Sequence, residues 1–120
     1  MLHLTIAFSK NPRLNPLIER AVTPENITLE FVQIHPAELF FRNLKYDEFD
    51  VTEMSISDFL MARERSDGTR WQWSALPVFL LKAFLWLNTF VNNQSGIESA
   101  ADLKGKRVGV PDYQMTAALW

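Results

Sequence analysis

The stretch Ile27-Thr-Leu-Glu-Phe-Val-Gln-Ile-His-Pro36 joins a strand pattern directly to the start of a helix. Apolar side chains occupy alternate positions from Ile27 to Phe31, which predicts a strand with one buried face. His35-Pro36 then opens a helix, because the missing N–H of proline costs nothing at the first helical position. A strand that leads at once into a helix is part of a β-α-β unit, so this stretch indicates a parallel sheet.

The segments on either side repeat this arrangement. Leu2–Phe8 is rich in β-forming residues and predicts a first strand. Asn15-Pro16 predicts a helix entry, with Asn15 as the N-cap and proline next to it. The helix after His35 is expected to have one apolar face, formed by Ala37, Phe40, Phe41 and Leu44.

Later segments continue the alternation. Residues 51–56 predict a third strand, and Ser57-Asp58 predicts the start of a third helix. The apolar runs 73–79 and 84–91 predict two more strands. A last strand is expected over residues 106–110.

Two turns complete the pattern near the end of the chain. Ser99 to Asp102 predicts a capping box before a short helix, with Gly105 as its left-handed C-cap. Pro111-Asp112 predicts one more helix start. The whole order is β-α-β-α-β-α-β-β-α-β-α, which predicts an α/β fold with a mostly parallel sheet and helices on both faces.

Composition excludes several classes of function. The chain has 120 residues, of which 48% are hydrophobic and 22% are charged, a globular composition. The net charge of −2, with both signs interspersed, gives no basic surface for nucleic acid. The absence of cysteine excludes disulfides and thiolate chemistry. His3 and His35 do not form a ligand pair at metal spacing, so we expect no metal.

The sequence also bears on membranes and compartment. The most apolar run, residues 76–91, is interrupted by Lys82 and Asn88, and it is shorter than the roughly 20 residues of a membrane helix. We therefore expect no membrane insertion. The stretch after Met1 has no pattern of a signal peptide, which predicts a cytoplasmic protein if Met1 is the native start. A periplasmic location follows instead if a leader was removed.

Polar residues gather where the predicted strands end. Ligands of open α/β sheets bind outside the carboxyl ends of the strands, where helix starts favour anions. Four stretches take such positions, namely residues 9–13, 35–36, 53–58 and 111–116. A small carboxylate is the ligand that they favour. Helix capping alone accounts for each stretch equally well.

Three single residues have both a functional and a structural interpretation. Glu53, a carboxylate at an apolar strand end, is a candidate acid or base, with a solvated or ion-paired glutamate as the alternative. His35 is either catalytic or a helix-entry histidine. Lys82 either directs its ammonium into a cleft or extends it to water.

Three stretches resemble the 4,5-dihydroxyphthalate decarboxylase-like proteins. They are Phe40-Phe-Arg-Asn-Leu44, Glu48-Phe-Asp-Val-Thr-Glu-Met-Ser55 and Ile97 to Trp120, with its core Asp102-Leu-Lys-Gly-Lys-Arg-Val-Gly-Val-Pro-Asp-Tyr-Gln-Met-Thr-Ala-Ala118. This family shares the type II periplasmic-binding-protein fold with transporter solute receptors and thiamine-precursor-binding proteins. The Glu-Met-Ser and Pro-Asp-Tyr-Gln-Met-Thr pieces are the most specific. The resemblance covers nearly the whole chain but only the front part of a family member.

The resemblance implies two lobes with a ligand cleft between them. Residues 1–104 correspond to the first lobe without its returning C-terminal segment. Residues 105–120 correspond to the first strand and the helix start of a second lobe, which is truncated. A lone fragment of this kind is expected to be inactive.

The resemblance also implies a cofactor-free decarboxylase that acts on a hydroxylated aromatic acid and delivers a proton to the ring carbon. Arg13 and Lys82 would hold carboxylates, and Glu53 or His35 would be the general acid. The remaining polar residues would bind the substrate and orient its ring: Ser55, Ser57, Tyr113, Gln114 and Thr116.

Departures from the family pattern support an alternative. After Pro77-Val-Phe79 the family has an Arg and then an Arg-His-Ser run, whereas this chain has Lys82 and then Leu85-Trp86-Leu87. Fewer cations favour a non-catalytic solute-binding protein of the ABC-transporter type, for a small organic anion, with a permease as partner. The lack of a leader favours the enzyme. Both interpretations allow a homo-oligomer.

Overall fold

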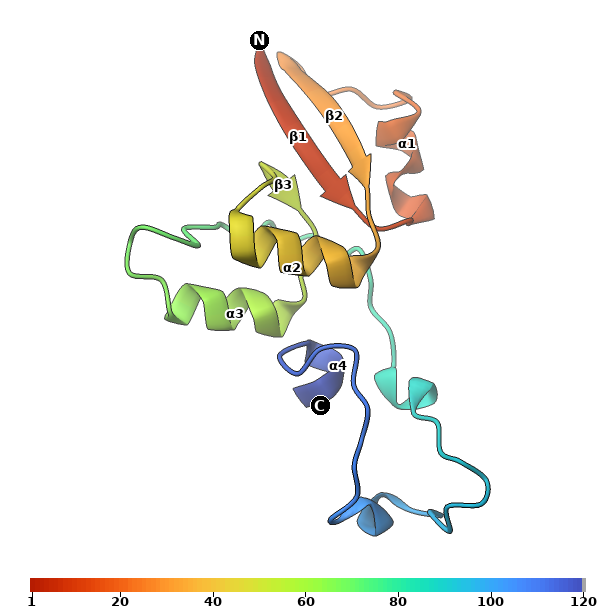
Figure 1. The fold of residues 1–120 in the computed structure, drawn as a ribbon. Helices are drawn as coiled ribbons and strands as arrows, with labels where there is room; N and C mark the ends of the chain where they lie inside the picture. Colours follow the sequence, from red (N-terminus) through yellow and green to blue (C-terminus); the bar gives the residue numbers. More distant parts are fainter. Residues whose placement is uncertain (120) are drawn as a thin grey trace.

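A computed structural model describes residues 1–119 of the chain. Trp120, the last residue of the segment predicted to begin a second lobe, lies outside the described residues. The fold is α/β around an open sheet of three strands, all parallel (Figure 1). The strands are β1 (Leu2–Phe8), β2 (Ile27–Gln33) and β3 (Val51–Thr52). The predicted fold class is thereby confirmed.

The strand β1 lies in the centre of the sheet, in the order β2-β1-β3. It pairs with β2 over its whole length, from Leu2 opposite Ile27 to Phe8 opposite Gln33. Its pairing with β3 covers only two positions, of which one is Ile6 opposite Val51. The strands β1 and β2 contribute Ala7 and Val32 to the core beside α2.

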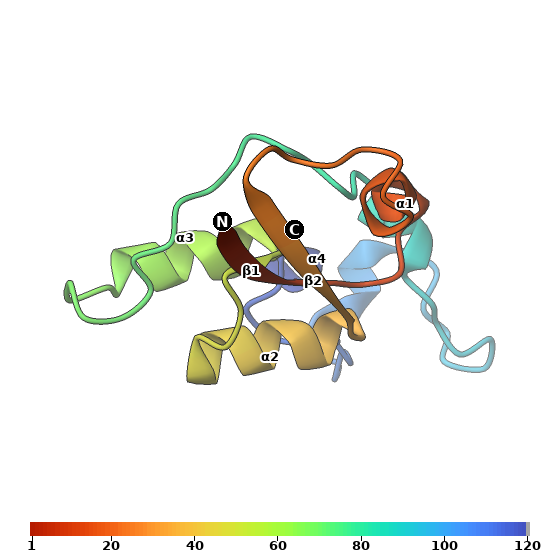
Figure 2. The ribbon, with the colours of Figure 1, turned by 90° about the horizontal axis from the view of Figure 1, so that it is seen from above.

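The helices that follow the strands are η1 (Pro12–Leu14), α1 (Asn15–Ile18), α2 (Pro36–Tyr46) and α3 (Ile56–Glu64). From β1 the chain crosses to β2 on one side of it in the sheet. From β2 it crosses back past β1 to β3, on the other side of β1. Because crossovers between parallel strands are right-handed, this reversal puts α1 and α2 on opposite faces of the sheet. Figure 2 shows the two helices on either side of the strands.

The helix α2 confirms the predicted entry and corrects the predicted face. The Nδ1 atom of His35 accepts a hydrogen bond from the N–H of Ala37 at 3.4 Å, and Asp47 ends the helix in a left-handed conformation with φ of 53°. The buried face consists of Leu39, Phe40 and Asn43. Phe41, predicted to be part of that face, is 53% exposed.

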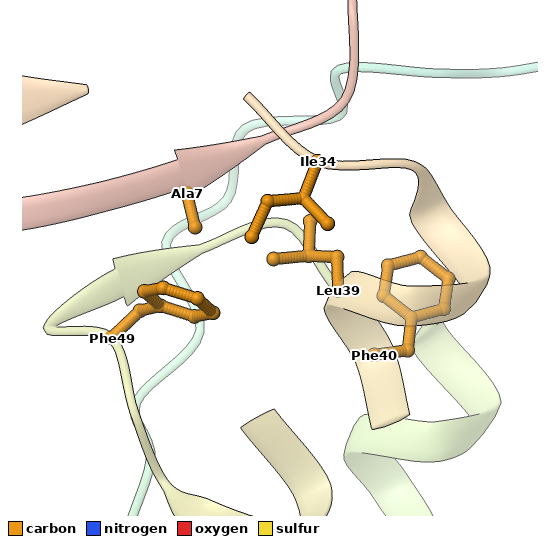
Figure 3. Packing of buried hydrophobic residues seen from close by; sticks show 5 residues of the cluster. All are labelled: Ala7, Ile34, Leu39, Phe40 and Phe49. Atoms are coloured by element: carbon orange, nitrogen blue, oxygen red, sulfur yellow. The ribbon is translucent and has the colours of Figure 1, made fainter. Parts of the chain in front are cut away.

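The core lies between the sheet and α2. Ala7 of β1 contacts a cluster of apolar side chains from β2's end, α2 and the turn before β3, which Figure 3 shows. The cluster consists of Ala7, Ile34, Leu39, Phe40 and Phe49, with Val32, Met54 and Met115 packed against it. Met115 ties the C-terminal part of the chain to this core.

Two boundaries differ from the prediction. Asn11 is the residue that caps the first helical segment, since its Oδ1 accepts the N–H of Arg13 at 3.1 Å. The predicted N-cap Asn15 is instead the first residue of α1. The third strand ends at Thr52, and α3 begins at Ile56 with Ser55 as its N-cap.

The strands predicted over residues 73–79, 84–91 and 106–110 are wrong, since the described chain has no strand after β3. The second of these runs contains only a short 3-10 turn, η2 (Leu85–Asn88). An apolar run becomes a strand only where a neighbouring edge accepts its backbone hydrogen bonds, and none of the described segments offers one there.

The predicted turns near the C-terminus are present in shorter form. Ser99 and Asp102 form the capping box of η3 (Ala100–Leu103), a single 3-10 turn. Gly105 has the predicted left-handed conformation, with φ of 75°. The last helix, α4 (Thr116–Leu119), starts later than Pro111-Asp112 predicts.

The shape of the chain is extended. Its radius of gyration is 17.7 Å, whereas a compact domain of this length has about 14 Å. Figure 1 shows the segment after α3 as a long loop that leaves the sheet and returns at α4. The division into lobes at residue 105 stays a prediction. Within residues 1–119 we find no helix of sufficient length and apolarity to span a membrane.

Candidate functional site

The candidate site lies where the strand order reverses. The loop after β1 begins the crossover to β2 on one side, and the segment after β3 leads into α3, so the two strand ends border the kind of crevice in which open α/β sheets bind ligands. A cavity of about 320 Å³ occupies this position. Its walls are residues 9–13, Glu53, and the pair Leu80 and Leu81.

Glu53 joins the two strand ends. Its Oε1 atom accepts a hydrogen bond from the backbone N–H of Ser9 at 2.7 Å, in a half-buried position. This bond fixes the carboxylate at the carboxyl end of both β1 and β3. Charge-assisted hydrogen bonds of this kind are stronger than neutral ones, so Glu53 holds the crevice in shape.

Arg13 and Asn11 bind the opposite wall. The Nη1 atom of Arg13 donates to the carbonyl oxygens of Leu80 at 2.8 Å and Phe79 at 3.3 Å. The Nδ2 atom of Asn11 donates to the same Leu80 oxygen at 3.1 Å. These hydrogen bonds hold residues 79–81 against the loop after β1.

The charges that line this cavity are unequal. Lys10 and Arg13 are cations, and Glu53 is the only acid among its lining residues. Arginine carries five donors, so Nη1 can bind the loop while the rest of the guanidinium remains able to bind a carboxylate. The cavity therefore suits a small anion.

A second group of predicted residues forms a hydroxyl cluster at the start of α3. The Oγ atom of Ser55 lies 3.0 Å from Oγ1 of Thr116, and Oγ of Ser57 lies 3.1 Å from the same atom. The Ser57 hydroxyl also donates to the carbonyl oxygen of Gln114 at 2.7 Å. The backbone N–H of Thr116 donates to Ser55 Oγ at 3.1 Å. The cluster thus attaches the last described segment to α3.

Tyr113 and Gln114 line another cavity, of about 340 Å³. The Tyr113 side chain is 82% exposed. The Gln114 side chain donates to Asp112 Oδ2 at 3.1 Å. The predicted site residues are thus divided between the first cavity, the hydroxyl cluster and the second cavity.

His35 and Lys82 line neither of these two cavities. His35 is exposed and caps α2. Lys82 is exposed and follows directly on Leu80 and Leu81 of the first cavity's wall.

Asp58 is a residue that the sequence interpretation treated only as a helix start. It lines the second cavity and is 1% exposed, and neither of its oxygens has a hydrogen-bond partner among residues 1–119. Burial raises the pKa of its carboxyl above the usual value, and the negative charge of Asp112 adds to the rise. The nearby Ser55 hydroxyl lowers the pKa of Asp58 by a smaller amount, although its geometry is not that of a hydrogen bond.

A sequence signal for Asp58 exists in hindsight. Asp58, Met61, Ala62 and Arg65 are spaced as one stripe of a helix, with the acid on the same side as two apolar residues. Asn11, the other missed residue, has no comparable signal because its partner Leu80 is 69 residues away in the chain.

No cluster of three or more histidine, aspartate, glutamate or cysteine side chains that could hold a metal ion occurs in the described part of the chain.

The sequence of the chain is similar to those of known proteins. No family model matches the chain. Two curated proteins, both called 4,5-dihydroxyphthalate decarboxylase, match 119 residues, or 99% of the chain. The protein of Pseudomonas putida is 40% identical, and that of Comamonas testosteroni is 39% identical. The chain spans 45% of the first and 35% of the second, which is less than half of either relative. The resemblance noted in the sequence is confirmed: over nearly its whole length the chain is similar to two proteins called 4,5-dihydroxyphthalate decarboxylase.

Proposed function

We propose that the protein is a 4,5-dihydroxyphthalate decarboxylase-like enzyme that binds a small aromatic carboxylate in the first cavity. The observation that carries this proposal is the position of Arg13, Lys10 and Glu53 around one crevice at the reversal of the strand order. The similarity to two decarboxylases supports the reaction type. A cavity of about 320 Å³ is within the range that binds single-ring molecules.

The binding step follows from the charges of the walls. The carboxylate of the substrate pairs with the guanidinium of Arg13, and Lys10 adds a second positive charge. Lys82 joins them from the segment next to Leu81, as the resemblance implies. The hydroxyl cluster of Ser55, Ser57 and Thr116 acts indirectly, because it keeps the segment with Tyr113 and Gln114 on α3.

The chemical step needs a proton and no electron acceptor. A proton from a general acid bonds to the ring carbon that bears the carboxylate, while a phenol oxygen supplies electrons to the ring. The bond between this carbon and the carboxylate then breaks, carbon dioxide leaves, and the electron pair of that bond restores the aromatic ring. Glu53, which lines the cavity, is the proposed acid, and His35, which does not line it, is the second candidate.

The test is carbon dioxide release from hydroxylated aromatic acids, measured with the protein at the full length of its relatives. We expect Glu53→Gln to abolish turnover, because glutamine keeps the acceptor for the Ser9 N–H but has no acidic proton. His35→Gln is the matched variant and should keep most of the activity. Loss of turnover in His35→Gln alone would transfer the role to the histidine.

A non-catalytic solute-binding protein for an organic anion is the second candidate. Its support is that Glu53 is already engaged by Ser9 and that Arg13 is already engaged by the loop carbonyls, both as structural contacts. Binding of the aromatic acid, weakened by Arg13→Gln but without carbon dioxide release, would favour this function and a permease partner.

We propose further that residues 1–104 are an incomplete first lobe and that residues 105–120 begin a second lobe. A cavity closed by two lobes needs both, so the 120-residue chain should release no carbon dioxide by itself. Turnover by the isolated chain would contradict this division.

A further inference from the structure

The second cavity lies on one stripe of α3. Asp58, Met61, Ala62 and the C-cap residue Arg65 line it, and steps of three and four positions (58 to 61 or 62, and then to 65) put them on one side of the helix. Asp58 stands at one end of the stripe and Arg65 at the other, about 10 Å apart along the helix axis at 1.5 Å per residue. Between them the wall is apolar.

Two aromatic residues, Trp71 and Tyr113, also line the cavity, and Trp71 is held by contacts with the end of α2. The Nε1 atom of Trp71 donates to the carbonyl oxygen of Leu44, the end of α2, at 2.9 Å. The Arg70 guanidinium lies 4.7 Å from the Trp71 ring and donates to that same oxygen at 3.0 Å. Trp71 has φ of 54°, a strained conformation for a residue with a side chain, and these contacts maintain it. Tyr113 closes the cavity from the C-terminal segment.

Asp58 requires a partner that the described chain does not provide. Both carboxyl oxygens are buried, and neither receives a hydrogen bond from the described residues. A buried polar group without a hydrogen bond costs free energy, so native proteins satisfy nearly all of them. A hydrogen-bond donor on a bound molecule would remove this cost.

We propose that the second cavity is a separate binding site for a small aromatic alcohol, whose hydroxyl donates to Asp58 and whose ring packs against Met61 and Trp71. The volume of about 340 Å³ accommodates one ring. The proposal concerns a different cavity from that of the proposed decarboxylation and does not depend on it.

A neutral donor fits this cavity better than an ammonium group. Arg65 lines the same cavity and repels a cation. An ion pair buried at Asp58 would also require the desolvation of both charges, which often exceeds their attraction. A hydroxyl satisfies a carboxyl oxygen without a second charge.

The test is an NMR titration of the isotopically labelled 120-residue chain with three molecules of nearly equal shape: benzyl alcohol, toluene and benzylamine. We expect benzyl alcohol to shift the resonances of the cavity residues and to bind about tenfold more tightly than toluene, as one hydrogen bond to a carboxylate predicts. Asp58→Leu should remove that difference, so that both molecules bind alike.

The variants keep the test decisive. Asp58→Leu replaces an unpartnered buried acid by an apolar side chain, so it should not unfold the chain. Asp58→Asn is the second variant, and its amide oxygen should retain part of the preference. Glu53→Gln, in the first cavity, should leave benzyl alcohol binding unchanged.

The proposal is overturned if benzyl alcohol does not bind, if Asp58→Leu leaves the preference intact, or if benzylamine binds most tightly. Since benzyl alcohol has no carboxylate, none of these results decides the proposed decarboxylation.

Discussion

Two regions of the chain have similar apolar content but very different burial. Every buried residue of the described chain lies between Ile6 and Ala62, the region of the sheet with α2 and α3. Residues 66–119 include no buried residue, although the run from Leu76 to Val91 is the most apolar of the sequence. Most of the large apolar side chains of this run are exposed. The exposed fraction is 73% for Phe79, 77% for Leu87 and 86% for Phe90.

The difference shows what converts an apolar pattern into structure. In the first region β2 and β3 pair with the two edges of β1, and α2 packs its buried residues into the core beside the sheet. In the second region the backbone of residues 73–91 has no neighbouring strand among residues 1–119, and its apolar side chains have no opposing layer. Exposed apolar surface of this extent is characteristic of a contact with another part of a protein. We propose that the second lobe supplies that contact.

The strongest test of this comparison is a pair of leucine truncations. Leu39 is fully buried in the core and Leu76 is 72% exposed. Leu39→Ala should lower the free energy of unfolding by roughly 2–5 kcal/mol, because it removes buried methyl groups and leaves a cavity. Leu76→Ala should change it by less than about 0.5 kcal/mol. Urea unfolding followed by circular dichroism measures both.

Equal effects of the two truncations would show that the second region is packed in solution and would contradict the comparison. A protein at the full length of the relatives is the matched extension of this experiment. There we expect Leu76→Ala to cost more than it does in the 120-residue chain, since the proposed second lobe would cover the side chain.

The next largest effect is expected at the joint between β1 and β3. Glu53→Ala removes the carboxylate that accepts the N–H of Ser9. Hydrogen bonds to charged groups contribute about 1.5–3 kcal/mol, so the loop after β1 should open more often. Faster amide hydrogen exchange at Ser9 measures this. Glu30→Ala, an exposed glutamate of β2, is the control and should leave the exchange at Ser9 unchanged.

The sequence predicted the elements whose signals are local. The strands β1 and β2 and the helix α2 have their periodicity, caps and turns within their own residues, and the structure has them at the expected places. The face of α2 was misplaced because its centre is polar. Asn43 is 1% exposed, and its Oδ1 accepts the N–H of Phe49 at 3.4 Å. A search for apolar periodicity gives no weight to a buried asparagine, so it assigned Phe41 to the face instead.

The features that depend on distant partners could not be predicted. The length of β3 depends on how far its pairing with β1 extends, and the predicted later strands needed an edge that the described chain lacks. The position of the first cavity was predictable, since strand ends of a parallel sheet share one rim. The contact of Arg13 with Leu80 was not, because the loop that contains Leu80 has no pattern that fixes its path.

A smaller effect is expected where the second region is attached to α3. Thr116→Val removes the hydroxyl that contacts Ser55 and Ser57 but keeps the shape of the side chain. The two serines remain 3.0 Å apart and can bind one another, so the loss should be about 1 kcal/mol and confined to this segment. Faster amide exchange at Ala118 and Leu119 would report it. Thr89→Val, at an exposed threonine, should have no such effect.

The smallest effect is a change in pH dependence at Asp58. Burial raises the pKa of this carboxyl in the folded chain above its ordinary value of 3.8. The folded state therefore binds the proton more tightly than the unfolded state, and the resulting stabilisation is complete below pH 3.8 and is lost as the pH rises through the folded pKa. Asp58→Asn has no proton to lose, so its free energy of unfolding should lack this fall.

The two proteins should accordingly have similar free energies of unfolding at low pH and should diverge as the pH rises toward 7, with the asparagine variant the more stable. Urea unfolding across this pH range measures the divergence. Asp67→Asn is the control. Hydrogen bonds from Thr69 lower the pKa of that exposed carboxyl, so the pH dependence that this substitution removes has the opposite sign. If wild type and Asp58→Asn changed in parallel with pH, the pKa of Asp58 would be the same in the folded and the unfolded chain, and the carboxyl could not be a buried group without a hydrogen-bond partner.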